Sequence, residues 1–260
     1  VHDNAAAHEV QTLVAELAKP KAAPGAVFEH IRADQQQGLD EFAKVKAETG
    51  PSGTAGDLFR FLDWDKSGWP DKAKFEPLFD AVIKAKLSIY AGDPPRADIK
   101  RIAKEGEAAL PEPERQRLGL DRPFPAAAQE TLLDDLEKSH CGLMPKTAFT
   151  KLAYAQRYRD AYLADVVLKA ASEHGSAILF AGNGHVRADR GVPYYLRQRA
   201  PAKKIVTVML IEVEDGKYDP EAYDIKGADG QPLADFIVFT PRQIRPDPCE
   251  EMKKSFGKKR

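Results

Sequence analysis

Histidine and carboxylate side chains, which serve as ligands of catalytic metals and as acid–base groups, occur in four short segments of the sequence. Each segment follows a short apolar run, or stands where such a run would end. Ligands of open α/β sheets bind beyond the carboxyl ends of the strands, so we expect the four segments to share one rim. Taken singly, each segment is better explained as a helix cap or a tight turn, and it is their joint placement that favours a functional site. The segments are His2-Asp3-Asn4, Glu29-His30, Asp93 with Arg96, and Gly182-Asn183-Gly184-His185.

A long helical pattern from Lys146 to Glu173 supplies further polar residues. Its apolar arc, read at about 100° per residue, consists of Leu152, Ala155, Leu163, Val166 and Val167. The side chains of Gln156, Arg159 and Asp160 fall inside that same arc. Polar groups on a buried face must be paired. They form either a structural Arg–Asp ion pair or the wall of a pocket at the strand ends.

The opposite face of this helix carries tyrosines. Tyr154, Tyr158 and Tyr162 are spaced four residues apart and form one stripe. Lys151, Asp165 and Lys169 share that face, which predicts that it points outward. An outward aromatic stripe indicates a subunit interface, a contact with a helical insertion, or a flat aromatic ligand.

The elements that must position these residues alternate between strands and helices. This alternation predicts βαβ units, and hence an α/β fold with a mostly parallel β-sheet flanked by helices. The expected helices cover Ala5 to Ala18, Asp34 to Ala47, Asp71 to Ala85 and Lys146 to Glu173. The expected strands are Ala26 to Phe28, Leu87 to Tyr90, Ala177 to Phe180, Ile205 to Val213 and Phe236 to Phe239.

Between Pro94 and Pro145 the pattern changes, because no strand-like run occurs and prolines and charges are dense. We expect a small all-helical subdomain over residues 96–145, inserted into a core domain made of residues 1–95 and 146–260.

Composition sets limits on function. The chain has 260 residues, 39 Lys and Arg against 40 Asp and Glu, and two cysteines. A net charge of −1 argues against nucleic-acid binding, which favours a concentrated basic face. Two cysteines are too few for a disulfide scaffold. The longest apolar run, Ile205 to Ile211, is far shorter than the roughly 20 residues of a membrane helix.

Many of these motifs occur together, in order, in one known family. They are His2-Asp3-Asn4 with His8 and Gln11, Val27-Phe28-Glu29 with Asp34-Gln35-Gln36, Trp64 with Gly68-Trp69-Pro70, Ile89 to Arg96, His140 to Pro145, Ala155 to Asp160, Gly182 to Arg187 with Gly191-Val192-Pro193, and Asp247 to Glu250. On these blocks the sequence resembles the ChaN-like haem-binding uptake family of the Tiki superfamily. Family members carry Gly-Glu before the His-Asp-Asn block, and we expect that Glu and an export signal to precede Val1.

The resemblance implies a haem-binding protein of bacterial iron uptake rather than an enzyme. It further implies a homodimer with haem between the subunits and a tyrosine as iron ligand. We expect that ligand among Tyr154, Tyr158 and Tyr162, with Tyr90, Tyr194 and Tyr195 as competitors. The expected location is outside the cytoplasm, as a periplasmic or outer-membrane lipoprotein whose lipid anchor lies outside this chain.

The wider superfamily implies an alternative, a metal-dependent hydrolase. Its metal, zinc or manganese, would be held by His2, Glu29 and His185. Glu29 and Asp160 would be the catalytic candidates, and Asp160 or Asp93 would orient a histidine or act as base. The pocket around them would include Asn4, His8, Asp93, Arg96, Gln156, Arg159 and Asp160.

Whether the two cysteines form a disulfide depends on the compartment in which the protein resides. In an exported protein, a Cys141–Cys249 disulfide would close a loop of about 108 residues and stabilise the fold by a few kcal/mol. The alternative is two unrelated thiols.

Overall fold

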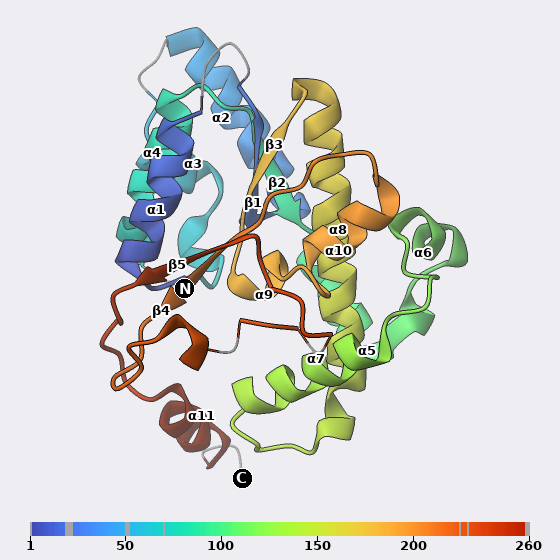
Figure 1. Cartoon of the computed structure of the whole chain (residues 1–260). Helices are drawn as coiled ribbons and strands as arrows, with labels where there is room; N and C mark the ends of the chain where they lie inside the picture. The colour runs from blue at the N-terminus through green and yellow to red at the C-terminus, as the bar shows by residue number, and fades with distance from the viewer. Residues whose placement is uncertain are drawn as a thin grey trace.

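A three-stranded parallel sheet forms the centre of the computed structural model, which describes residues 2–18, 23–49, 53–69, 71–223, 225–227 and 229–257 (Figure 1). Its strands are β1 (Gly25–Arg32), β2 (Ile89–Asp93) and β3 (Ala177–Phe180), in the order β2-β1-β3. Val27 of β1 lies opposite Tyr90 on one side and Leu179 on the other. The first seven residues of β1 are buried, as expected for a parallel strand covered on both faces.

Four helices cover one face of the sheet. They are α1 (Ala5–Glu16), α2 (Gln36–Thr49), α3 (Ala55–Phe61) and α4 (Glu76–Lys84). The core between them and the sheet is strongly aromatic: the ring of Phe28 stacks on Phe79 at 4.3 Å and on Phe180 at 5.0 Å between centroids. Local capping fixes where these helices begin. Asn4 accepts from the backbone N–H of Ala7, and Thr54 forms a capping box with Asp57 at the start of α3.

The long helix α8 (Thr150–His174) lies on the other face and ends at Gly175, whose φ of 80° suits a glycine. A second apolar core joins α8 to α5 (Arg96–Glu105), α6 (Glu112–Leu118) and α10 (Val192–Arg199). Ile102 of α5 and Leu118 of α6 are fully buried in this core.

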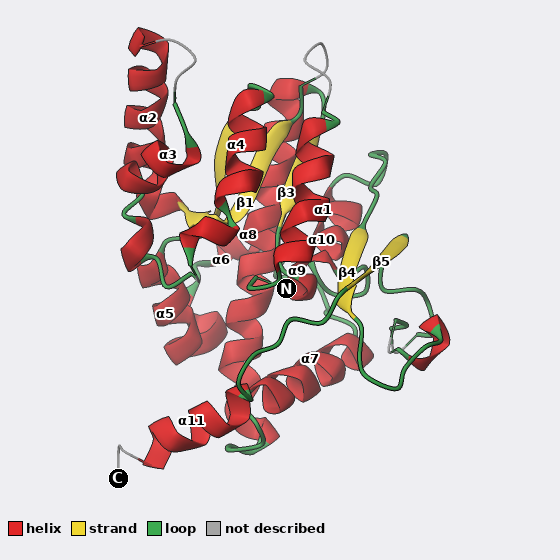
Figure 2. Ribbon diagram, turned by 90° about the vertical axis from the view of Figure 1, so that its left-hand side faces the viewer, coloured by secondary structure: helices red, strands yellow, loops and turns green. Residues whose placement is uncertain are grey.

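A second, two-stranded sheet follows, made of the parallel strands β4 (Val208–Glu212) and β5 (Phe236–Thr240). The short helix α9 (Asn183–Val186) lies between β3 and α10 in the sequence. Helix α7 (Ala126–Ser139) and the C-terminal helix α11 (Pro248–Gly257) lie beyond the sheets, at the bottom of Figure 2.

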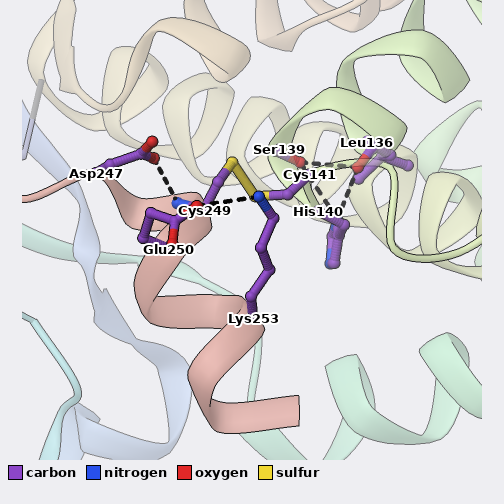
Figure 3. Close-up of a disulfide and its surroundings, with 8 residues drawn as sticks. All are labelled: Leu136, Ser139, His140, Cys141, Asp247, Cys249, Glu250 and Lys253. Atoms are coloured by element: carbon purple, nitrogen blue, oxygen red, sulfur yellow. Dashed lines mark hydrogen bonds and ion pairs between the residues drawn. A yellow bond between two sulfur atoms is a disulfide. The ribbon is translucent and has the colours of Figure 1, made fainter. Parts of the chain in front are cut away.

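A disulfide between Cys141, just after α7, and Cys249 of α11 ties these two helices together (Figure 3). The predicted pairing of the two cysteines is therefore confirmed. Because Cys141 lies between α7 and α8, the bond fixes the C-terminal helix to the end of the segment that was predicted as an insertion.

The predicted α/β class with parallel strands and flanking helices is confirmed, and all five expected strands form. They make two sheets instead of one, since β3 and β4 are not hydrogen-bonded to each other. Four helices were not predicted: α3, α9 and α10, each of which is too short to show a helical period, and α11 near the C-terminus. Residues 96–145 contain α5, α6 and α7 and no strand, and their separation as a subdomain stays a prediction. In the described part of the chain, every helix is too short or too polar to cross a bilayer.

Candidate functional site

Glu29, near the carboxyl end of β1, is the centre of a buried ionic cluster, and its side chain is 4% exposed. Its Oε2 accepts the backbone N–H of Gly182 at 2.7 Å. Its Oε1 accepts from Arg159 Nη2 at 3.1 Å and lies 3.2 Å from His185 Nε2. Burial alone would raise the pKa of Glu29, but the charges of His185, Arg159 and His2 hold it well below its ordinary value.

His185, on the short helix α9, joins this carboxylate to a second one. Its Nδ1 lies 2.6 Å from Asp160 Oδ1, so both ring nitrogens face carboxylates. Burial would lower the pKa of His185, yet Glu29 and Asp160 outweigh it and raise the pKa to about 10. His185 is therefore an imidazolium at neutral pH, donating from both nitrogens.

Arg159 holds the remaining carboxylate of the cluster. Its Nε donates to Asp93 Oδ1 at 2.8 Å while its Nη2 reaches Glu29. The cluster thus contains the carboxylates Glu29, Asp93 and Asp160 against the cations Arg159 and His185. Burial raises the pKa values of Asp93 and Asp160. Repulsion from the nearby Glu29 carboxylate raises both pKa values further.

His2 approaches the cluster from the N-terminal segment. Its Nε2 lies 3.7 Å from Glu29 Oε2, and its Nδ1 lies 3.3 Å from His30 Nε2. Burial lowers the pKa of His2 and lowers that of His30 to about 3, so both rings are neutral at pH 7. Trp69 packs on both rings and donates from its indole to the His30 carbonyl oxygen. A neutral imidazole and an imidazolium therefore flank one carboxylate.

A pocket of about 390 Å³ opens above this cluster at the carboxyl ends of β1 and β3. Its floor is formed by His2, Glu29, Asp160, His185 and Gln156, whose Nε2 lies 3.3 Å from His185 Nδ1. Helix α7 forms the opposite wall. That wall is fastened by the ion pair of Asp135 with the buried Arg190, which also donates to Thr131.

The sequence-predicted site residues divide into two groups. Those from the ends of β1, β2 and β3 and from the polar arc of α8 meet as predicted: His2, Glu29, Asp93, Gln156, Arg159, Asp160 and His185. Asp93 and Arg159 lie behind Glu29 and do not line the pocket.

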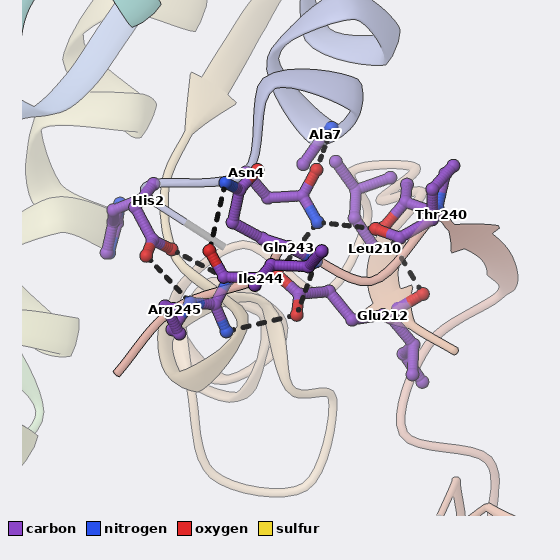
Figure 4. A network of polar contacts seen from close by, with 12 residues as sticks. His2, Asn4, Ala7, Leu210, Glu212, Thr240, Gln243, Ile244 and Arg245 are labelled. Carbon is purple, nitrogen blue, oxygen red and sulfur yellow. Dashed lines mark hydrogen bonds and ion pairs between the residues drawn. The ribbon is translucent and has the colours of Figure 1, made fainter. Parts of the chain in front are cut away.

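Three residues predicted for the pocket lie elsewhere. Asn4 caps α1 and donates to Glu212 Oε1 at 2.7 Å and to the Pro241 carbonyl oxygen at 2.9 Å, which fastens the N-terminal segment to the β4–β5 sheet (Figure 4). His8 is buried against Phe75 and binds the His2 carbonyl oxygen. Arg96 begins α5 and is exposed.

The predicted outward placement of the tyrosine stripe is wrong for two of its members. Tyr154 and Tyr158 are 8% and 3% exposed, because α5 and α6 cover this face of α8. Contact with the helical insertion, one of the three alternatives, is thus confirmed. Tyr162 is half-buried at the edge of the same core.

Sequence reasoning missed the roles of Trp69, Arg190 and the Gly182 backbone. Gly182 had a usable signal, since it lies two residues after the end of a strand. A Cβ at this position would lie 2.5 Å from His2 Nε2, so only glycine lets the imidazole approach Glu29. Arg190 and Asp135 gave no signal, because their pairing depends on where α7 packs.

The donor set of the predicted metal site does not fit a metal ion. No group of three His, Cys, Asp or Glu side chains within the described residues has a suitable arrangement. The reason is chemical as well as geometric. A metal-ligating imidazole must offer a free lone pair, whereas the two ring nitrogens of His185 already lie 3.2 Å and 2.6 Å from the carboxylate oxygens of Glu29 and Asp160.

Comparison with known proteins agrees with this architecture. A family model described as "Haem-binding uptake, Tiki superfamily, ChaN" matches residues 1–196. The chain belongs to this family. The family match includes every residue of the ionic cluster and the whole tyrosine stripe. The strands β4 and β5 and the helix α11 lie beyond it.

A solved structure titled "Cofacial heme binding to ChaN of Campylobacter jejuni" is similar to the chain, with 25% sequence identity and a TM-score of 0.56. The similarity covers 75% of this chain and 69% of that one. No curated protein matches the chain. The ChaN family therefore accounts for the α/β fold and indicates haem binding in uptake.

Proposed function

We propose that the protein binds haem between two copies of the chain and that a tyrosine of α8 is the iron ligand. Membership of a haem-binding uptake family and similarity to a ChaN structure titled for cofacial haem binding support this proposal. A phenolate is a suitable hard ligand for ferric haem, as the tyrosine ligand of catalase illustrates.

The choice of an α8 tyrosine rests on whether each tyrosine hydroxyl already has a hydrogen-bond partner. The competing tyrosines are engaged: Tyr90 donates to Glu173, Tyr194 donates to the Pro123 carbonyl oxygen, and Tyr195 accepts from Arg157. Among the described residues, the hydroxyls of Tyr154, Tyr158 and Tyr162 have no hydrogen-bond partner, and that of Tyr154 is completely buried.

Tyr162 is the member of the stripe that an external ligand reaches most directly, because it is only half-buried. Burial raises the pKa of its phenol, and the nearby Arg117 acts in the opposite direction. The ring centroids of Tyr158 and Tyr162 lie 6.0 Å apart, so the buried Tyr158 packs behind Tyr162 and supports its ring.

Titration of the purified protein with ferric haem tests the proposal. We expect a saturable Soret band at about one haem per chain, with dimerisation in analytical ultracentrifugation. Tyr162→Phe should change the charge-transfer bands of the ferric complex. Tyr218→Phe is the matched control, since this tyrosine is 95% exposed and lies outside the stripe. Identical spectra for Tyr162→Phe, Tyr158→Phe, Tyr154→Phe and the parent would refute the assignment to α8.

We infer a second candidate function, hydrolysis of a small substrate in the strand-end pocket. The observation in its favour is that the neutral imidazole of His2, which can accept a proton, lines the pocket 3.7 Å from the Glu29 carboxylate. A metal-dependent form of this hydrolase requires His185 to lose a proton and one of its ring nitrogens to give up its contact with Glu29 or Asp160.

Assays with carboxylic ester substrates, with and without zinc or manganese, test this candidate. Turnover that is lost in His2→Ala and retained in the distant His174→Ala supports it. Metal analysis of the same samples separates the two forms. Turnover that is the same in both variants would exclude the pocket as its source.

We also propose that the protein is exported to the periplasm. The Cys141–Cys249 disulfide supports this, because such bonds persist in oxidising compartments. Thiol labelling of denatured, unreduced protein from fractionated cells should return no free thiol. Two free thiols per chain in the same denatured, unreduced sample would argue for a reducing compartment.

A further inference from the structure

Asp3, the residue that follows His2, is bound by an arginine from the C-terminal part of the chain. Arg245 donates to Asp3 as a fork, from Nε to Oδ2 at 2.8 Å and from Nη2 to Oδ1 at 3.0 Å. The same guanidinium donates from Nη1 to Glu212 Oε2 at 3.0 Å and from Nη2 to Glu212 Oε1 (Figure 4). Arg245 therefore joins a carboxylate of the N-terminal segment to a carboxylate at the end of β4.

Asn4 makes a second attachment between the same two parts of the chain. Its Nδ2 donates to Glu212 Oε1 and to the Pro241 carbonyl oxygen, while its Oδ1 accepts from the first turn of α1. Both amide hydrogens and the amide oxygen are thus used, which fixes the orientation of this side chain. We call Asp3, Asn4, Glu212 and Arg245 the clasp.

His2 itself makes only weak polar contacts through its ring. Its Nε2 lies 3.7 Å from Glu29 Oε2, which is too long for a hydrogen bond. Its Nδ1 lies 3.3 Å from His30 Nε2, and its ring centroid lies 4.7 Å from that of Trp69. The place of this imidazole beside Glu29 therefore depends on how firmly the backbone of residues 2–4 is held.

Two sets of contacts hold that backbone. On the core side, His8 Nε2 lies 3.0 Å from the His2 carbonyl oxygen, and Lys74 Nζ donates to the Asp3 carbonyl oxygen at 2.9 Å. The clasp supplies the other set, through side chains. It differs from the core contacts in being partly open to water, since the side chains of Asp3 and Arg245 are each 35% exposed.

The charges of the clasp make the guanidinium decisive. Burial would raise the pKa of Glu212, but hydrogen bonds from Arg245 and Asn4 hold it below its ordinary value, so Glu212 is ionised at pH 7. Arg245 thus binds two carboxylates at once. Without it, the charges of Asp3 and Glu212 repel each other and push the N-terminal segment away from β4.

We propose that Arg245 is a positioning residue for His2: through Asp3 and Glu212 it holds the N-terminal segment so that the imidazole stays beside Glu29. Arg245 and Glu212 lie beyond residues 1–196, which the family model matches, so a part of the chain outside that match supports a residue inside it. The proposal concerns the pocket of the second candidate function, but it is a statement about the place of a side chain and holds with or without turnover.

Chemical modification of His2 in the purified protein tests the proposal. Diethyl pyrocarbonate acylates accessible neutral imidazoles, and mass spectrometry of peptides gives the rate for each histidine. We expect Arg245→Gln to speed modification of His2 by about three- to fivefold, the size of effect expected for a partly exposed ion pair. In NMR spectra of the same variant, the nuclear Overhauser effects between the His2 and Trp69 rings should weaken.

Arg242→Gln is the matched control. It removes the same charge from the same segment, but Arg242 pairs with Asp215, whose side chain is 90% exposed. His174 is the internal reference, because general unfolding would speed its modification as well. If Arg245→Gln does not fold, Arg245→Lys decides in its place: a lysine keeps the charge but not the fork, so the rate for His2 should still rise.

The outcomes are distinct from those for the second candidate function. A His2 rate in the folded Arg245 variant equal to that of the parent overturns the proposal and assigns the position of His2 to the core contacts of His8 and Lys74. An equal rise in Arg242→Gln overturns it too, since the effect would then be one of net charge. Absence of hydrolysis removes the second candidate function and leaves this inference unchanged, because neither readout depends on turnover.

Discussion

Replacing Asp160 by Asn removes one charged partner of His185 without changing the size of the side chain. The structure fixes the magnitude through the pKa of His185, which is raised from 6.5 to about 10. One pKa unit corresponds to about 1.4 kcal/mol, so the pairing of His185 with its two carboxylates, after the opposing effect of burial, contributes a net of about 4 kcal/mol at pH 7. Glu29 remains in the variant. We therefore expect Asp160→Asn to lower the free energy of unfolding by about 2–4 kcal/mol.

The sign of the pH dependence follows from the direction of this shift. A group whose pKa is raised in the folded state stabilises fully below its unfolded value, and this stabilisation is lost as pH rises through the folded value. The contribution of His185 is thus complete below about pH 6.5 and lost by about pH 10. Glu29, whose pKa is lowered, loses its contribution only as pH falls toward its folded value. Parent and variant should converge in stability above pH 10.

Two measurements check this reasoning. Urea unfolding gives the free energy, and for a chain of this size the loss corresponds to a melting temperature lower by about 4–8 °C. NMR of the imidazole nitrogens gives the protonation state of His185 directly. Asp134→Asn is the control, since Asp134 pairs with Lys146 at the surface and should leave unfolding unchanged. A neutral His185 at pH 7 in the parent, or a variant as stable as the control, would show that the cluster is assigned wrongly.

Three further predictions concern other parts of the molecule. Binding of ferric haem through the phenolate of Tyr162 releases a proton, so the haem association constant should rise up to tenfold per pH unit below the pKa of that phenol. Spectroscopic titrations with haem at several pH values measure this constant. An association constant that does not change with pH would exclude a phenol ligand. Joint replacement of Cys141 and Cys249 by Ser should lower the free energy of unfolding by about 2–5 kcal/mol in urea, with a smaller effect if the loop is already compact in the unfolded chain. Asn4→Ala should cost about 1–2 kcal/mol by the same assay, and more than Thr54→Ala, since Asn4 also binds β4–β5 residues while Thr54 only caps α3.

The ionic cluster could be predicted from sequence because each member is fixed by a local rule. Glu29 and Asp93 each end a short apolar run, and parallel strands bring their carboxyl ends to one edge. Asp160 lies in the apolar arc of α8 and has to face the sheet. The partners within the cluster were not predictable in the same way. The two neighbours Arg159 and Asp160 bind different groups, Asp93 and His185, and only the packed structure separates them.

The tyrosine face shows where local reasoning fails. Lys151 and Asp165 indicated an outward surface, yet these charged residues are the ones that fasten the insertion. Lys151 donates to the Lys104 carbonyl oxygen, and Asp165 pairs with Arg117 of α6. A charged side chain at the rim of a helix–helix contact is indistinguishable in sequence from one on a free surface, because both keep their charge near water.

The two faces of α8 differ in how firmly they are held, and this decides what moves when haem binds. On the sheet side, Arg159 and Asp160 take part in buried ion pairs, and breaking one costs about 3–5 kcal/mol. On the tyrosine side, the polar fastening of α6 is the partly exposed pair of Arg117 with Asp165, a kind of contact worth about 0–1 kcal/mol. Helix α8 therefore stays in place, and access to Tyr158 or Tyr154 requires α5 and α6 to separate from it and expose Ile102 and Leu118. Tyr162 needs no such exposure, so under the proposed tyrosine ligation it is the member of the stripe that the haem iron would reach first.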